Sequence, residues 1–273
     1  MKGLRTTDNC YGVVPKPNVS CWSAGVNLLE LWHQRFGHAN YKQVAKVSKL
    51  EVVIGLPKFG KIKKNVCGPC QLGKQTKSTH PKVNIVATSR LLELLHVDLM
   101  GPTRMESMGG KKRYIMVVVD DFSRYSWVEF LREKLEACEK MEKLCKKLQN
   151  EKRVPIIKIK SDHGKELENT KFEAFCNEHG IKKEFLAPKT PQQNGVVERK
   201  NYVIQEMARV MLFNKDILQK FWFEAVNTSY HIGNRIFFRV ETMKTSYEIW
   251  KEKKPKVKYF QVFGSKCFIL SDE

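Results

Sequence analysis

Hydrophobic residues in the second third of the chain occur in short runs separated by polar turns, which is the pattern of an α/β sheet. The run at 114–120 is continuous and β-branched, and this predicts a strand buried on both faces. The run at 91–98 fits either a helical turn or a buried strand that ends at Asp98. Further strands are expected at 125–131, 154–160 and 182–186.

Between these strands the apolar residues recur every three or four positions, as they do in amphipathic helices. The clearest case is 133–152, where Cys138 and Cys145 belong to the apolar stripe and are expected to be small core residues. Strands and helices in this order predict an α/β fold, a mixed sheet with helices packed on it, preceded by a small N-terminal module. Further helices are expected at 169–179, 196–213 and 218–238.

Composition places the chain among globular proteins with a polyanionic partner. Its 273 residues are 42% hydrophobic and 29% charged, which excludes disordered and fibrous classes. No apolar run reaches the roughly 18 residues of a membrane span, so no membrane partner is expected. Because 49 Lys and Arg oppose 29 Asp and Glu, the net charge is +20, and nucleic acid is the leading candidate partner.

Three carboxylates are candidates for a shared metal site. Asp98 and Asp162 each lie where an apolar run gives way to a polar turn, and Glu198 lies early in a predicted helix. Taken alone, each acid is better explained by a structural role than by a metal site: Asp98 and Asp162 as turn or cap residues, and Glu198 as an acid in the first turn of a helix. If they converge, two Mg²⁺ or Mn²⁺ ions would neutralise them, because oxygen ligands suit hard cations.

Two pairs of residues near the N-terminus have the spacing of zinc ligands. Four residues separate His33 from His38, two separate Cys67 from Cys70, and 28 separate the pairs. A single Cys-x2-Cys is a weak signal, but two imidazoles and two thiolates together predict one closed, tetrahedral and structural Zn²⁺ site. The chain shows no secretory signal, so a disulfide framework is not expected.

Several long motifs resemble the integrases of retroviruses and retrotransposons, and more narrowly those of copia-type long-terminal-repeat elements. Asp162 and Glu198 are separated by 35 residues, within Ser-Asp-His-Gly-Lys-Glu and Pro-Gln-Gln-Asn-Gly-Val-Val-Glu-Arg. The His-His-Cys-Cys set resembles the domain that precedes integrase cores. The remaining matching motifs lie at 31–38, 96–102, 119–128, 190–195 and 221–226.

The resemblance implies a ribonuclease H-like core in which Asp98, Asp162 and Glu198 are catalytic and bind two Mg²⁺ or Mn²⁺ ions. Asp120 and Asp121 rival Asp98 as the first acid, but they match a structural Asp-Asp-Tyr/Phe-Ser-Arg element of the family, so Asp98 is preferred. The implied contacts to DNA are Gln193 and Asn194 in the loop before the helix, and Lys200, Tyr202 and Arg209 on the helix.

The resemblance also implies a domain order and an activity. We expect a zinc-binding GAG pre-integrase domain at 1–80, a basic linker at 81–90, a catalytic core at 91–240 and the start of a truncated C-terminal region at 241–273. The expected function is 3′-end processing and strand transfer on double-stranded DNA by a homo-multimer. Such a protein would act in the nucleus after a cytoplasmic particle stage, without a small-molecule substrate.

Three residues depart from the family pattern and support an alternative function. His163, Lys165 and Leu167 stand where the family commonly has asparagine, glycine and phenylalanine, and Lys165 places a cation beside the acids. The alternative is a catalytically inactive remnant of a polyprotein that only binds zinc and nucleic acid. A host ribonuclease H is a third possibility, but it would not need the zinc module.

Overall fold

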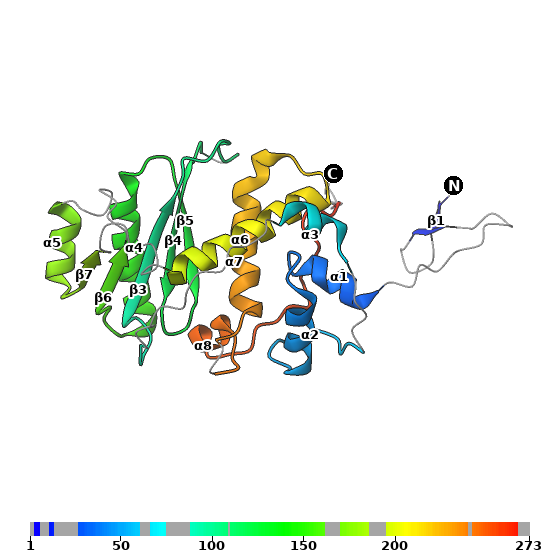
Figure 1. Ribbon diagram of the computed structural model, residues 1–273, viewed down its shortest axis with the longest axis horizontal. Coiled ribbons are helices and arrows are strands. Elements are labelled where there is room, and N and C mark those ends of the chain that lie inside the picture. The colour runs from blue at the N-terminus through cyan, green and yellow to red at the C-terminus, as the bar shows by residue number, and fades with distance from the viewer. Residues whose placement is uncertain are drawn as a thin grey trace.

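The computed structural model describes nine stretches of the chain and shows a sheet, its helices and a helical module beyond them (Figure 1). The described residues are 3–5, 11–13, 27–60, 66–74, 88–108, 110–161, 170–185, 195–239 and 242–266. Within them, no helix is long and apolar enough to cross a membrane.

The central sheet has five strands in the order β5-β4-β3-β6-β7. Strands β3, β4 and β5 are antiparallel neighbours, whereas β6 runs parallel to both β3 and β7. The predicted mixed sheet is thus confirmed. The ambiguous run at 91–98 forms a strand from Leu94 onward, but the strand continues past Asp98 to Met100 instead of ending there. The bounds are β3 (Leu94–Met100), β4 (Tyr114–Asp120), β5 (Ser126–Leu131), β6 (Lys158–Ser161) and β7 (Lys182–Phe185).

The predicted strand at 154–160 begins later than expected. Strand β6 starts at Lys158, three residues after Pro155, which lacks the N–H group that a sheet ladder needs. Ile156 nevertheless is only 1% exposed, so the apolar run reports burial correctly although its first half is not in the strand.

Alternate residues of β4 enter two separate cores, one on each face of the sheet. Met116 and Val118 pack under α4 (Glu136–Lys152) and α5 (Thr170–Glu178), together with Cys138 and Cys145, which are core residues as predicted. Ile115, Val117 and Val119 face the other way, toward α6 (Gly195–Asn214) and α7 (Trp222–Ile236). Figure 1 shows these helix pairs on opposite sides of the sheet.

The helix predicted at 218–238 is a 3-10 turn, η2 (Gln219–Phe221), followed by α7. Near the C-terminal end of α7, the buried side chain of Asn234 accepts hydrogen bonds from the Ser126 amide and hydroxyl, and donates to the Ser126 carbonyl. These three bonds fix α7 to the edge strand β5.

The N-terminal module consists of α1 (Leu28–Arg35), α2 (Tyr41–Lys49) and α3 (Gly68–Gly73), with a separate β1 (Gly3–Arg5) and β2 (Tyr11–Val13) pair. Asn27 and Asn40 cap α1 and α2 through their side-chain oxygens. Apolar residues of α1 and α2 such as Leu29, Trp32 and Val44 are buried, as is Phe36 after α1, whereas Leu31 is only half-buried.

The module has no core of its own, because its apolar residues continue into those of α6 and α7. A Cβ atom at Gly37 would lie 3.1 Å from the Met211 sulfur, and one at Gly73 would lie 2.7 Å from Val210 Cγ2. Glycine at these two positions lets the module approach α6 closely.

The segment after α7 packs on both the sheet and the module. In α8 (Ser246–Lys251), Trp250 is fully buried against Trp127 of β5, with ring centroids 4.7 Å apart. Further along, Ile54 of the module bonds to the backbone of Pro255 and Val257, and Phe260 packs against Phe36. The described part of the C-terminal region therefore joins the two parts of the molecule.

Candidate metal centres

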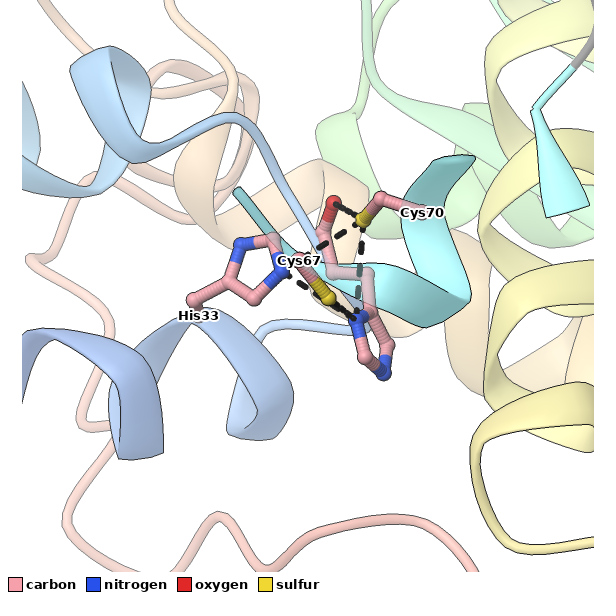
Figure 2. Close-up of side chains that lie close together, drawn as sticks. His33, Cys67 and Cys70 are labelled. Carbon is pink, nitrogen blue, oxygen red and sulfur yellow. Dashed lines mark hydrogen bonds between the residues drawn. The ribbon is translucent and has the colours of Figure 1, made fainter. Parts of the chain in front are cut away.

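Four side chains of the N-terminal module converge on one buried point. His33 and His38 come from the end of α1 and the turn after it, and Cys67 and Cys70 come from the start of α3. One ligand atom from each residue lies within 4.8 Å of all the others, and all four residues are buried. Figure 2 shows the labelled side chains of His33, Cys67 and Cys70 pointing toward one another.

The distances between these atoms match the edges of a zinc tetrahedron. Zn–N bonds of about 2.05 Å and Zn–S bonds of about 2.3 Å place two nitrogens about 3.4 Å apart, and a nitrogen about 3.6 Å from a sulfur. His33 Nε2 lies 3.1 Å from His38 Nδ1 and 3.4 Å from Cys70 Sγ. Cys67 Sγ and Cys70 Sγ lie 3.5 and 3.7 Å from His38 Nδ1. The donor set and its spacing therefore fit one tetrahedral zinc ion.

Neighbouring groups set the histidines in the form that binds metal. The Ala39 carbonyl accepts a hydrogen bond from His33 Nδ1 at 2.7 Å, which leaves the Nε2 lone pair facing the cluster. The ring of Tyr41 stacks on His33 with centroids 4.1 Å apart. Burial, with the nearby charges of His33 and Lys74, lowers the pKa of His38 to about 3, so its imidazole is neutral at pH 7.

Before a cation binds, the Cys70 side chain is held in its protonated form, which does not bind metal. Burial raises the pKa of the Cys70 thiol to about 12. A bound cation reverses this preference, because thiolates are the ligating form and metal binding releases their protons.

At the sheet, Asp98 lies next to helix α6. It belongs to β3, and its neighbours Val97 and Met100 pack in opposite cores, which places Asp98 on the α6 face. The Asn201 side-chain amide donates a hydrogen bond to Asp98 Oδ2 at 2.5 Å. Glu198 precedes Asn201 by three residues on α6, and residues at this spacing lie about one helical turn apart on the same face. Glu198 is exposed.

Asp162 and the adjoining residues His163, Lys165 and Leu167 lie outside the described residues, as do Gln193 and Asn194. The last described residue before Asp162 is Ser161, which pairs with Val97 in the parallel β3–β6 ladder.

The rival acids Asp120 and Asp121 are occupied by structural contacts. Asp120 is fully buried and accepts hydrogen bonds from the amides of Leu92 and Ser123 and from the Ser123 hydroxyl. Asp121 is 1% exposed, and its carboxylate contacts His96, Thr88 and Arg124. These contacts support the choice of Asp98 as the first acid.

The three described DNA-contact candidates on α6 lie in different surroundings. The Lys200 ammonium donates to the Arg124 carbonyl at 3.3 Å and lies 5.6 Å from the Phe237 ring centre. Burial and the charge of Arg124 lower the pKa of Lys200 to about 7. Tyr202 interacts with Glu206, and Arg209 Nε donates to the Gln205 carbonyl. All three remain candidates, with Tyr202 and Arg209 half-buried at the helix surface.

Two residues near Asp98 were not predicted from the sequence. For Asn201, the sequence offers only its position three residues after Glu198. Tyr230 of α7 donates its hydroxyl to Asn201 Oδ1 at 2.6 Å, and nothing in the sequence indicates this contact, because it joins two helices.

A five-stranded mixed sheet flanked by helices, with a buried His-His-Cys-Cys cluster before it, is the arrangement expected from the resemblance to integrases. Comparison with known families agrees. A family model for the GAG-pre-integrase domain matches residues 11–75, and one for the integrase core domain matches residues 90–191. The chain therefore carries these two domains in sequence and is a homologue of the Pol polyproteins of plant retrotransposons.

Curated relatives share most of this chain but are much longer. The Pol polyprotein of transposon TNT 1-94 from Nicotiana tabacum is 34% identical over 245 residues, which are 88% of this chain and 18% of that protein. That of transposon RE1 from Arabidopsis thaliana is 26% identical over 240 residues, 87% of this chain and 16% of that protein. The chain thus spans less than a fifth of the relatives it matches.

The fold is shared with a solved structure. A chain of the simian T-cell lymphotropic virus intasome in complex with the PP2A regulatory subunit B56 gamma aligns with a TM-score of 0.51 and 16% identity, covering 76% of this chain and 69% of that one. The HTLV-2 integrase catalytic core domain in complex with magnesium aligns with a TM-score of 0.43 and 21% identity, covering 58% of this chain and 95% of that one.

Proposed function

We propose that this chain is the integrase region of a copia-type retrotransposon polyprotein, and that it processes the 3′ ends of element DNA and joins them to target DNA. The integrase core domain indicates the polynucleotidyl transferase family. The activity of this chain, the acids that carry it and its DNA partners are the proposed part.

One observation carries the proposal: Asp98 and α6 are held together at the end of the parallel β3–β6 pair. Asn201 bonds Asp98 to α6, and Glu198 lies one turn earlier on that helix. Val97 pairs with Ser161, the last residue of β6, and in the sequence Asp98 and Asp162 follow these two residues. This arrangement supports a site that combines Asp98, Asp162 and Glu198.

The three carboxylates suit two Mg²⁺ or Mn²⁺ ions, which when bound supply the charge that activates an attacking oxygen and stabilises a leaving oxygen of a phosphodiester. Asp98 would hold its oxygens in place through the Asn201 hydrogen bond. Glu198 is exposed on the face of α6 that a DNA strand can reach. Exposure on one side is what distinguishes a reactive metal site from a structural one.

The zinc module would hold one structural Zn²⁺ through His33, His38, Cys67 and Cys70. The net charge of +20 supports binding to DNA, and its affinity should fall steeply as salt rises, because released counterions drive such binding. Gln193, Asn194, Lys200, Tyr202 and Arg209 remain the proposed DNA contacts. We also propose action as a homo-multimer in the nucleus.

The alternative is a catalytically inactive remnant that binds zinc and DNA. It is favoured by Lys165, a cation within three residues of Asp162. A lysine there would compete with the divalent ions for the carboxylates.

A nicking assay separates the two functions. The zinc-loaded chain is incubated with a labelled duplex carrying the element's terminal sequence, with Mn²⁺ or Mg²⁺ present. We expect a shortened 3′ end, and a loss of at least about 100-fold on Asp98→Asn or Glu198→Gln, because a transition-state contact is removed from each. Glu173→Gln, which changes an exposed acid on α5 across the sheet, is the matched control and should cut normally. Binding to the duplex without any metal-dependent cutting would favour the remnant.

A further inference from the structure

A chain of polar contacts runs from the buried helix α7 through α6 to Asp98. The Tyr230 hydroxyl donates to Asn201 Oδ1 at 2.6 Å, and Asn201 Nδ2 donates to Asp98 Oδ2 at 2.5 Å. Tyr230 is 2% exposed and Asn201 is 3% exposed, so water has little access to either group. Tyr230 lies behind α6 and is not within reach of a substrate that approaches Asp98 from solvent.

The direction of these hydrogen bonds follows from their chemistry. An ionised carboxylate only accepts hydrogen bonds, so the Asn201 amide must turn its NH₂ group toward Asp98. Its carbonyl oxygen, which also only accepts, then faces α7. Of the two partners, only the Tyr230 hydroxyl can donate to it. The carboxylate therefore determines which way the amide points, and the phenol, by donating to Oδ1, holds the amide in that orientation.

Without this hydroxyl, the amide is held at its NH₂ end alone, and its buried carbonyl oxygen loses the donor that supports it from α7. Rotation by half a turn would not restore the contacts, because it would set the carbonyl oxygen against the carboxylate, and two acceptors at hydrogen-bond distance repel each other. Tyr230 is well suited to remain a donor, because burial and the negative charge of Asp98 raise its pKa well above the ordinary value.

We propose that Tyr230 is a positioning residue for the cation site at Asp98, acting through the Asn201 amide. It keeps the amide in the one orientation that holds the Asp98 carboxylate in place for a divalent ion. This inference rests on the proposed function only in assuming that Asp98 binds the cation.

The test is Tyr230→Phe, which removes the hydroxyl and retains the ring. The full chain is first saturated with Zn²⁺, and Mn²⁺ binding is then measured by calorimetry and by electron paramagnetic resonance. We expect the Mn²⁺ dissociation constant to rise about 3- to 10-fold, the range of one buried hydrogen bond. In the nicking assay, the Mn²⁺ concentration for half-maximal rate should rise by the same factor, while the rate at saturating Mn²⁺ changes less than twofold.

Ser229→Ala is the matched control. It deletes a buried hydroxyl from the neighbouring position of α7, where Ser229 donates to the Ala225 carbonyl of the same helix. A general destabilisation of α7 would weaken Mn²⁺ binding in both variants. Loss of the Tyr230–Asn201–Asp98 contacts, which we call the relay, would weaken it in Tyr230→Phe alone.

A double-mutant cycle tests the route through Asn201. Asn201→Leu should weaken Mn²⁺ binding at least as much as Tyr230→Phe, and adding Tyr230→Phe to it should have no further effect. If Tyr230→Phe fails to fold, Asn201→Leu and Ser229→Ala alone decide. Unchanged Mn²⁺ affinity in either relay variant overturns the proposal, as does wild-type Mn²⁺ binding that does not depend on Asp98.

The two proposals fail in different ways. A wild-type chain that binds Mn²⁺ through Asp98 but never cuts DNA defeats the proposed function and leaves the relay to be judged by its binding data. A chain that cuts DNA while Tyr230→Phe binds Mn²⁺ like the wild type defeats the relay alone.

Discussion

The two candidate metal centres differ in how far the fold alone assembles them. In the zinc cluster, four buried ligand atoms from two short segments already lie at tetrahedral spacing. At the sheet, Asp98 is half-buried and Glu198 is exposed. The difference is the one expected between a closed site, whose metal contributes to folding, and an open site, whose ligands must also admit a substrate. Stability should therefore depend on the first and activity on the second.

The largest effect is expected from Cys67→Ser or from a zinc chelator. Structural zinc binding contributes on the order of 10 kcal/mol, so loss of one thiolate should cost about 5 kcal/mol or more and unfold the module. Urea unfolding monitored by circular dichroism, with zinc content measured in parallel, checks this. Cys138→Ala changes a buried cysteine of α4; this variant should keep its zinc and lose only about 1 kcal/mol of stability.

A substitution at Asp121 tests whether this buried acid has a structural role, in contrast to the proposed catalytic role of Asp98. Removing its carboxylate in Asp121→Ala leaves His96 and Arg124 without their partner and should cost about 3–5 kcal/mol at pH 7. Denaturant unfolding measures this cost, and Glu173→Ala, at an exposed acid of α5, should show almost none. A small cost for Asp121→Ala would show that the buried network is dispensable.

The pH dependence of this cost has a defined sign. Burial alone would raise the pKa of Asp121, but the hydrogen bond from His96 and the charge of Arg124 lower it on balance. A lowered folded pKa stabilises the protein fully above the unfolded value of about 4, and the contribution is lost as pH falls through the folded value. The stability gap between wild type and Asp121→Ala should therefore narrow below about pH 4.

The smallest effect on stability is expected from Asp98→Asn. In the metal-free protein it removes a charge from a group of acids while keeping the shape that accepts the Asn201 hydrogen bond. The free energy of unfolding should change by less than about 0.5 kcal/mol, although nicking is lost. Unfolding and nicking measured on one preparation check this, and a cost of several kcal/mol would mean that Asp98 is a structural acid like Asp121.

The sequence predicted those features that depend on local pattern. Strand β4 has its predicted bounds because it coincides with a run rich in β-branched residues, and α4 follows an unbroken apolar stripe. The four zinc ligands were predicted because their spacing and their chemistry are both restrictive. Asp98 was harder to choose, since a carboxylate after a strand fits a turn as well as a site, and only the contacts of Asp120 and Asp121 distinguish it.

Features that depend on distant contacts were not predicted. Tyr230 meets Asn201 across two helices, and no sequence motif marks this pair in the way that the His and Cys pairs mark the metal cluster. The return of the C-terminal region is a second case. Trp250 packs in the core on the α4 side of the sheet, and Phe260 packs in the core that includes residues of α1. Neither residue belongs to a periodic apolar pattern in the sequence.

The fit of Gly37 and Gly73 against α6 has a consequence for how the chain can be divided. The helix that carries Glu198 is supported from behind by the zinc-binding segment, so cutting the polypeptide at the basic linker would leave Met207 and Met211 facing water. A fragment of residues 91–240 should self-associate through this uncovered flank. We therefore expect a single unfolding transition in calorimetry only for a fragment that includes the N-terminal module and the C-terminal region together with the sheet.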